Sequence, residues 1–275
     1  MKIAINAWSA PADVSFQDLF RKIAAAGFDG IELNLDAEGT SAHALTVKTG
    51  PSELHEILSL SESYNLPICS ISTSLYGCAP LGSADQSERQ RGKNILLRQL
   101  DLAHTLKADT ILVVPGGISQ SVSRVKAYEH ALCALSEIKK DIEASGIFVG
   151  LENVWNSFFL SPTDLIQFLD QLDSPSIGAY FDVGNVAVSS YPEHWIEMLG
   201  QRIFKVHIKD FYRPSSWYQG YFVNLYEGSI DWSRVIQALR SAGYDDYMTA
   251  ELAPMPQNPD YLYRITEDAM RHMLQ

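Results

Sequence analysis

Four ionisable residues each stand near the end of a short, largely apolar segment. They are Glu152 in IFVGLEN, Asp182 in SIGAYFDV, His207 in RIFKVHIKD and Glu251 in DYMTAELA. Carboxylates held close together repel one another, and a cation relieves that repulsion. Three carboxylates with one imidazole suit Mn²⁺, Mg²⁺ or Co²⁺ better than a thiolate-rich structural zinc site does. If the fold brings these four residues together, we expect them to bind a divalent metal ion. Mn²⁺ is the favoured ion, and Mg²⁺, Co²⁺ and Zn²⁺ are the alternatives.

The segment KVHIKD shows how one strand could serve that centre. Alternate side chains of a strand point to opposite faces, so His207 and Lys209 share one face while Asp210 lies on the other. His207 would then offer a nitrogen to the metal. Lys209 would either meet a substrate oxygen or balance the acidic charge, and we favour the second role. Glu32, within the segment FDGIELNL, is a candidate for binding the substrate.

Strand-like and helix-like segments alternate along the whole chain. The expected strands are residues 2–8, 28–35, 67–73, 108–115, 147–153, 176–183, 202–210 and 246–253. The amphipathic segments between them are residues 15–27, 51–65, 89–108, 128–146, 161–173, 191–201 and 231–243. Apolar residues recur there at three- and four-residue steps, which indicates helices packed on a sheet. This alternation predicts one α/β domain over residues 1–275, a (β/α)8 TIM barrel.

An open, doubly wound sheet is the competing fold. Its usual glycine-rich turn is missing, because the first strand is followed by WSAPADVS, and the chain has no P-loop motif. In the barrel, the carboxyl ends of the strands meet at one rim, where such folds place their chemistry. Two long loops, YGCAPLGSADQSE and FYRPSSWYQGYFVNLYEGSI, follow strands and are expected to cover that rim. Four aromatic residues lie at or just beyond strand ends, where they could stack on the apolar face of a ligand or belong to the core: Trp8, Tyr76, Trp155 and Trp217.

Composition narrows the class of protein. The chain has 275 residues, 46% of them apolar, and a formal net charge of −12, which disfavours a nucleic-acid partner. Three cysteines without a CxxC pair favour a reducing compartment. Neither a signal peptide nor a membrane-spanning run is evident, so we expect a cytoplasmic protein. Whether it forms a homo-oligomer is left open.

Five motifs together resemble a known family. LENVW (151–155), FDVGN (181–185), VHIKD (206–210), EGSIDW (227–232) and TAEL (249–252) are similar in order and spacing to the sugar isomerase/epimerase superfamily with xylose-isomerase-like TIM barrels. That resemblance implies the four residues Glu152, Asp182, His207 and Glu251 as metal ligands. It also implies that Glu152 and Glu251 act as the acid/base pair.

The resemblance extends to substrate-binding candidates. Arg213, six residues after His207, resembles a substrate-binding arginine of ketose 3-epimerases, and Glu227 resembles a residue of the loop that closes the rim. Asn185 stands where hexulose 3-epimerases carry a histidine. The DVGN form is more similar to the pentulose-phosphate epimerase branch.

The chemistry and the resemblance together imply a small-molecule sugar or sugar phosphate as substrate. The expected enzyme is a metal-dependent epimerase or isomerase that transfers a proton through a metal-stabilised enediolate. Inosose-type dehydration and aldose–ketose isomerisation on the same site are the alternatives. A non-catalytic sugar-binding barrel is a further alternative. An endonuclease IV-like phosphodiesterase is less favoured, because FDVGN offers no additional histidine.

Overall fold

The computed structural model describes residues 1–215 and 219–275, so Trp217 lies outside the described residues. Eight parallel strands close into a barrel in the order β1-β10-β7-β6-β5-β4-β3-β2. These strands are β1 (Lys2–Asn6), β2 (Gly30–Leu35), β3 (Ile68–Thr73), β4 (Thr110–Val113), β5 (Phe148–Glu152), β6 (Ile177–Asp182), β7 (Ile203–Ile208) and β10 (Tyr247–Ala250). Each lies inside a segment predicted as a strand. The predicted (β/α)8 barrel is therefore confirmed.

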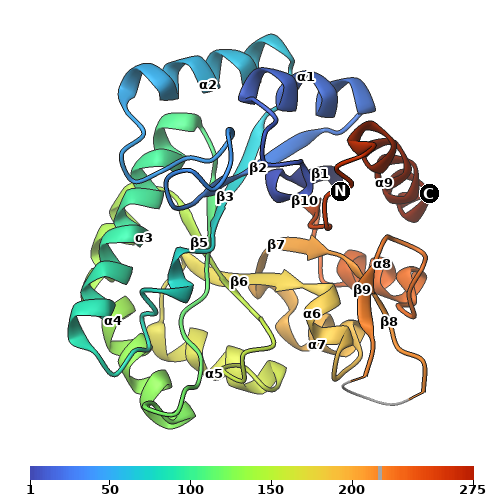
Figure 1. Ribbon diagram of the computed structural model, residues 1–275. Helices are drawn as coiled ribbons and strands as arrows, with labels where there is room; N and C mark the ends of the chain where they lie inside the picture. Colours follow the sequence, from blue (N-terminus) through green and yellow to red (C-terminus); the bar gives the residue numbers. More distant parts are fainter. Residues whose placement is uncertain (216–218) are drawn as a thin grey trace.

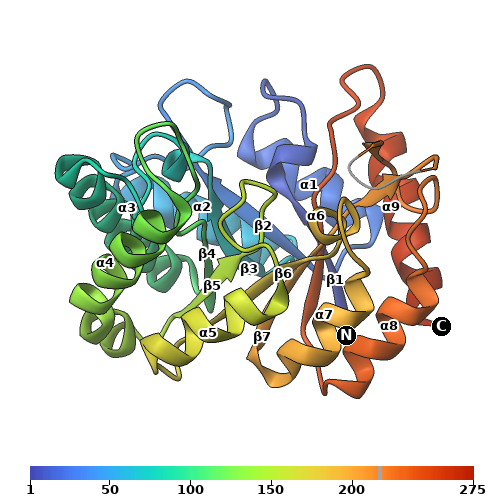
Figure 2. The ribbon, with the colours of Figure 1, turned by 90° about the horizontal axis from the view of Figure 1, so that it is seen from below.

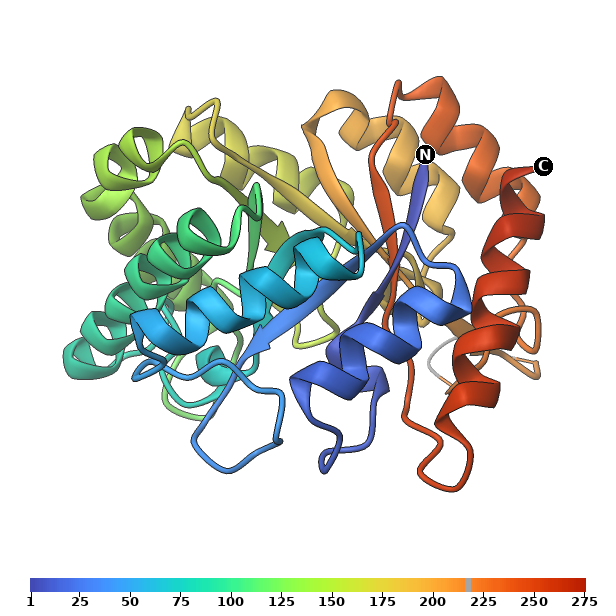
Figure 3. The ribbon, with the colours of Figure 1, turned by 90° about the horizontal axis from the view of Figure 1, so that it is seen from above.

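Helices surround the barrel on its outside (Figures 1 and 2). They are α1 (Phe16–Ala26), α2 (Pro51–Ser63), α3 (Gln86–Leu106), α4 (Arg124–Ser145), α5 (Pro162–Leu172), α6 (Val183–Ala187), α7 (Pro192–Leu199), α8 (Trp232–Ser241) and α9 (Pro259–Leu274). The seven predicted helical segments each match one of them, and α6 and α9 are additional. The last helix, α9, packs beside α1, so the two ends of the chain complete the ring together (Figure 3).

Local sequence signals start and stop the helices. The side chain of Ser15 caps α1 by accepting a hydrogen bond from the Asp18 amide, and Gly27 ends the helix in the left-handed region at φ 100°. Ser161 and Asp164 form a reciprocal capping box at the start of α5. Such caps fix where each helix begins after its strand. Among the described residues, no helix is both long enough and apolar enough to cross a membrane.

A buried lysine lies at the amino-terminal end of the barrel. Lys205 in β7 is fully buried, and its Nζ lies 3.0 Å from Asp109 Oδ1 and 2.5 Å from Asp246 Oδ2. A buried cation needs partners of opposite charge, and these two carboxylates supply them. Lys205 therefore belongs to the structure of the barrel floor, at the opposite end from the strand carboxyl ends.

The long loop after β7 contains an antiparallel hairpin that the sequence did not indicate. Its strands are β8 (Asp210–Tyr212) and β9 (Tyr221–Val223), and they lie beside α8 in Figure 1. Asp210 is fully buried and anchors the loop, because its carboxylate accepts hydrogen bonds from the Tyr226 amide at 3.0 Å and from Trp232 Nε1 at 3.0 Å. Asp210 thus organises the loop rather than the metal centre.

A glycine allows α6 to approach the end of β7. A Cβ atom added to Gly184 would lie 2.3 Å from Lys209 Cγ and 2.6 Å from the Lys209 carbonyl oxygen. Both distances are shorter than van der Waals contact. Gly184 in FDVGN is therefore required by the close packing of α6 against Lys209.

We expect Gly184→Ala to destabilise the protein by about 1–3 kcal/mol, because the added methyl group overpacks this contact. Gly77→Ala is the matched control, since a Cβ there meets no described atom within 4 Å. The measurement is urea unfolding of the two variants and the wild type. Equal midpoints for all three proteins would show that α6 does not need the glycine.

Candidate metal centre

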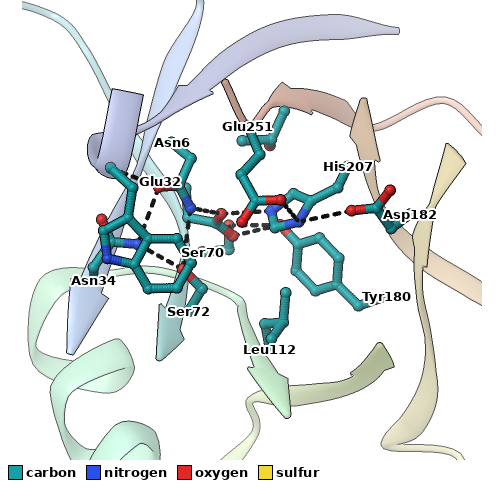
Figure 4. A network of polar contacts seen from close by, with 12 residues as sticks. Asn6, Glu32, Asn34, Ser70, Ser72, Leu112, Tyr180, Asp182, His207 and Glu251 are labelled. Carbon is teal, nitrogen blue, oxygen red and sulfur yellow. Dashed lines mark hydrogen bonds and ion pairs between the residues drawn. The ribbon is translucent and has the colours of Figure 1, made fainter. Parts of the chain in front are cut away.

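Four neighbouring strands bring the predicted ligands together. Glu152 ends β5, Asp182 ends β6, His207 lies in β7, and Glu251 follows β10 directly. These strands are adjacent in the barrel, and Asp182 pairs in register with His207. One ligand atom from each residue lies within 4.8 Å of those of the other three. Figure 4 shows Asp182, His207 and Glu251 pointing toward one another.

His207 Nδ1 is the nitrogen that faces the carboxylates. It lies 3.6 Å from Glu152 Oε1, 3.9 Å from Asp182 Oδ2 and 3.9 Å from Glu251 Oε2. This nitrogen is buried and has no hydrogen-bond partner among the described residues. Buried polar atoms are seldom left without partners, and a nitrogen surrounded by carboxylate oxygens is the donor set of a divalent cation. The four residues therefore fit a metal ion.

The other nitrogen of His207 is held by Glu32. His207 Nε2 lies 2.6 Å from Glu32 Oε1, and both side chains are fully buried. Ser70 Oγ donates to Glu32 Oε2 at 2.6 Å, and the Tyr180 hydroxyl donates to the same oxygen at 2.5 Å. Glu32 therefore lies behind the imidazole, with both oxygens occupied. These contacts indicate that Glu32 positions His207, and they fit that role better than direct contact between Glu32 and a substrate.

Three further polar residues support Glu32 from inside the barrel (Figure 4). The Asn6 amide donates to Glu32 Oε1 and, at 3.1 Å, to Ser72 Oγ. Asn34 Nδ2 donates to Ser72 Oγ at 2.7 Å and to Asn6 Oδ1 at 3.1 Å. Sequence reasoning missed this network. The one available signal was an asparagine near the end of each of two apolar segments, KIAIN and GIELNL.

Lys209 supplies positive charge on the mouth side of the centre. Its Nζ lies 2.9 Å from Asp182 Oδ2 and donates to Glu251 Oε2. Burial acts to lower the pKa of Lys209, but the charges of Asp182 and Glu251 outweigh it and hold the pKa above the usual value. Of the two roles predicted for Lys209, charge balance fits these contacts.

The two glutamates have different electrostatic surroundings. Burial, with the nearby charge of Glu251, raises the pKa of Glu152 from 4.5 to about 7, although the neighbouring His207 acts to lower it. Burial also acts to raise the pKa of Glu251, but the charges of Lys209 and His207 outweigh it and hold the pKa below its usual value. For His207, burial acts to lower the pKa, and the neighbouring carboxylates, Glu32 first, raise it well above its usual value.

Asn185 lies next to the candidate metal ligands. Its backbone amide donates to Asp182 Oδ1 at 2.8 Å, and its side-chain Nδ2 lies 3.5 Å from Glu152 Oε1. The side-chain oxygen Oδ1 is buried and receives no hydrogen bond from the described part of the chain. Among the predicted substrate-binding residues, Asn185 therefore has a hydrogen-bond acceptor, Oδ1, that no described residue satisfies.

Arg213 and Glu227 lie in the long loop after β7. Arg213 Nη1 donates to the Ala187 carbonyl at 3.1 Å, and its guanidinium lies 5.6 Å from the centre of the Tyr191 ring. Glu227 accepts hydrogen bonds from the amide and the side chain of Asn224 at 3.3 and 3.2 Å. These contacts are local to the loop and its neighbours, and the predicted substrate-binding roles of both residues stay predictions.

Comparison with known proteins identifies the family. The profile of the family described as Xylose isomerase-like TIM barrel matches residues 20–273. The chain belongs to this family. Among solved structures of the family's fold, a D-tagatose 3-epimerase-like protein superposes with a TM-score of 0.82 and 23% identity, over 100% of this chain and 97% of that one.

Two relatives of this xylose isomerase-like chain are similar over most of their length. An uncharacterised protein of Methanocaldococcus jannaschii is 27% identical over 86% of this chain and 79% of its own. A protein of Haemophilus influenzae, provisionally named L-ribulose-5-phosphate 3-epimerase, is 23% identical over 88% of this chain and 85% of its own. The resemblance noted in the sequence motifs is confirmed at the level of the superfamily.

We expect Glu32→Gln to weaken binding of Mn²⁺ about 10–100-fold, because the amide holds His207 Nε2 less firmly than a carboxylate does. Calorimetric titration with Mn²⁺ measures the affinity. The control is Glu62→Gln, an exposed glutamate that pairs with Lys107 on the outside of the barrel. Unchanged affinity in Glu32→Gln would contradict a positioning role.

Removing the Glu152 charge should stabilise the protein once metal is chelated. Since the pKa of Glu152 in the folded protein is about 7, against 4.5 as the ordinary value, its ionisation costs stability as pH rises through this interval. At pH 8 with EDTA, we therefore expect a higher Tm for Glu152→Gln than for the wild type. With Mn²⁺ the order should reverse, because the wild type gains a ligand-binding contribution. Thermal unfolding in both conditions measures this, and a lower Tm for the variant in EDTA would contradict the account.

Proposed function

We propose that this protein is a divalent-metal-dependent sugar epimerase or isomerase. The observation that supports the proposal most strongly is His207 Nδ1, which is buried, has no hydrogen-bond partner among the described residues, and is surrounded by the carboxylates of Glu152, Asp182 and Glu251. The relative named as an L-ribulose-5-phosphate 3-epimerase supports a ketose or ketose phosphate as substrate. Oxygen-rich ligation with one imidazole favours Mn²⁺.

The chemistry required is removal of a proton from a carbon beside a carbonyl. Such a proton is only weakly acidic, and a divalent cation held by the four residues would stabilise the negative charge that develops on oxygen when the proton leaves. Glu152 and Glu251 come from strands on either side of the cluster, β5 and the end of β10. One carboxylate takes the proton and the other carboxyl group returns one, so action on the same carbon from opposite faces inverts it.

The neighbouring residues prepare this pair for proton transfer. Lys209 holds Glu251 by a hydrogen bond, and Asn185 lies within 3.5 Å of Glu152 Oε1. The side chain of Glu152 is 8% exposed and that of Glu251 is 20% exposed, so water has limited access to both carboxyl groups. Limited access strengthens the electrostatic interactions inside the site.

Aldose–ketose isomerisation and inosose-type dehydration would use the same residues. They differ in where the proton returns, or in whether a hydroxyl group leaves. NMR analysis of the product separates the three outcomes: an inverted carbon, a moved carbonyl, or loss of water.

The decisive test is exchange of solvent deuterium into the substrate. The Mn²⁺-loaded wild type is incubated in D2O with ketoses and ketose phosphates and followed by NMR. We expect exchange at a carbon beside the carbonyl, and a loss of about 100-fold or more in Glu152→Gln and Glu251→Gln, in line with the size of general acid–base contributions. Asp260→Asn, on the exposed side of α9, is the control.

Two results would contradict the proposal. One is absence of exchange with every sugar tested, although Mn²⁺ is bound. The other is exchange that persists at the wild-type rate in both glutamate variants.

A further inference from the structure

An uncharged cleft adjoins the metal centre. It has a volume of about 300 Å³ and lies between the loop after β5 and the residues around α6. We call it the Trp155 cleft; the lining residues used below are Trp155, Ser157, Asn185 and Ser189. None of the described residues that line it is charged. This volume lies at the lower end of the range for small-molecule sites, which run from about 300 to 1,000 Å³.

Trp155 gives this cleft an aromatic wall. The residue is 67% exposed, which is unusual for so large an apolar group. Phe222 of the β8–β9 hairpin packs against it edge to face, with ring centres 5.8 Å apart. Phe222 in turn lies under Lys209, whose Nζ is 5.3 Å from the ring centre. Phe222 therefore packs against one side of Trp155, close to Lys209 and the metal centre. The other side of the indole ring is exposed.

Asn185 supplies a side-chain amide to the lining of the same cleft. The residue is 6% exposed, and its Oδ1 atom is buried without a hydrogen-bond partner in the described ranges 1–215 and 219–275. Its Nδ2 atom lies 3.5 Å from Glu152 Oε1, so one side chain connects the cleft to the proposed proton-transfer group. A buried acceptor without a partner costs stability unless a ligand satisfies it. A hydroxyl group donated by a ligand would do so.

This combination matches one chemical class of ligand. Sugars present a face of C–H groups that packs on the negative face of an aromatic ring, together with hydroxyl groups that need amide and hydroxyl partners. A phosphate does not match, because an aromatic face repels an anion and the described lining of the cleft offers no cation. Ser157 and Ser189 supply hydroxyl groups to the lining.

We propose that the Trp155 cleft binds an uncharged sugar unit of the substrate, with its C–H face on Trp155 and a hydroxyl group hydrogen-bonded to the side-chain amide of Asn185. The inference rests on the proposed function, because it places this unit beside the carbons that react. It deepens that function by assigning the substrate an uncharged end on the β5 and α6 side of the centre.

The test compares L-ribulose with L-ribulose 5-phosphate, and D-fructose with D-fructose 6-phosphate, in the Mn²⁺-loaded protein. For the uncharged sugar that is turned over best, we expect Trp155→Ala to raise KM about tenfold with kcat changed less than about twofold, since loss of a stacking contact weakens binding by about that factor. Trp155→Phe should restore most of the affinity. Tyr221→Ala is the matched control, because Tyr221 is an exposed aromatic residue next to Phe222 in the β8–β9 hairpin and is not part of the described cleft lining.

Calorimetry gives a second measurement that does not depend on turnover. Titration with an equilibrated mixture of substrate and product should show the same rise in Kd, about tenfold, for Trp155→Ala. Unchanged KM and Kd in that variant, or a preference for the phosphorylated sugar that Trp155→Ala does not alter, would overturn the inference. Binding that depends on Trp155 without any deuterium exchange would contradict the proposed function while supporting the cleft as a sugar site.

Discussion

Electrostatic repulsion among three carboxylates, two of them buried and the third partly buried, is the constraint around which this barrel is organised. Glu152, Asp182 and Glu251 converge at one rim, where low dielectric makes like charges costly. Lys209 offsets part of that charge from the mouth side, through Asp182 and Glu251. His207 faces the same oxygens with a nitrogen that no described residue engages in a hydrogen bond. In the function proposed here, a divalent cation would complete this arrangement and offset the cost of keeping these carboxylates together.

The rest of the barrel holds that arrangement in place. Glu32 fixes His207 from behind, and the inward-facing amides and hydroxyls around it satisfy each of its oxygens. Gly184 lets α6 pack on Lys209, and Asp210 anchors the loop whose hairpin carries Phe222. The ligands themselves lie on strands or directly at their ends. Elements far apart in the sequence thus determine the distances inside one small site.

The sequence predicted the parts of this site that depend on local pattern. Alternation along short apolar strands placed Glu152, Asp182, His207 and Glu251 at corresponding ends of consecutive units, and barrel closure then makes them neighbours. Glu32 behind His207 was not predictable in the same way, because β2 and β7 meet across the barrel interior with β1 and β10 between them. Helix α6 was not predicted, because it is too short to show a periodic apolar pattern. The β8–β9 hairpin was not predicted either, because its strands are short and lie in a segment interpreted as a loop.

Titration of the chelator-treated protein with Mn²⁺, followed by electron paramagnetic resonance, tests the central claim most directly. The account predicts one tightly bound ion per chain in the wild type. It also predicts a loss of affinity of about 100-fold or more in His207→Ala, which removes the one nitrogen ligand and leaves the oxygen donors, with Tm in EDTA measured alongside to confirm folding. Absence of a bound ion in the wild type, or equal affinity in a folded His207→Ala variant, would contradict it.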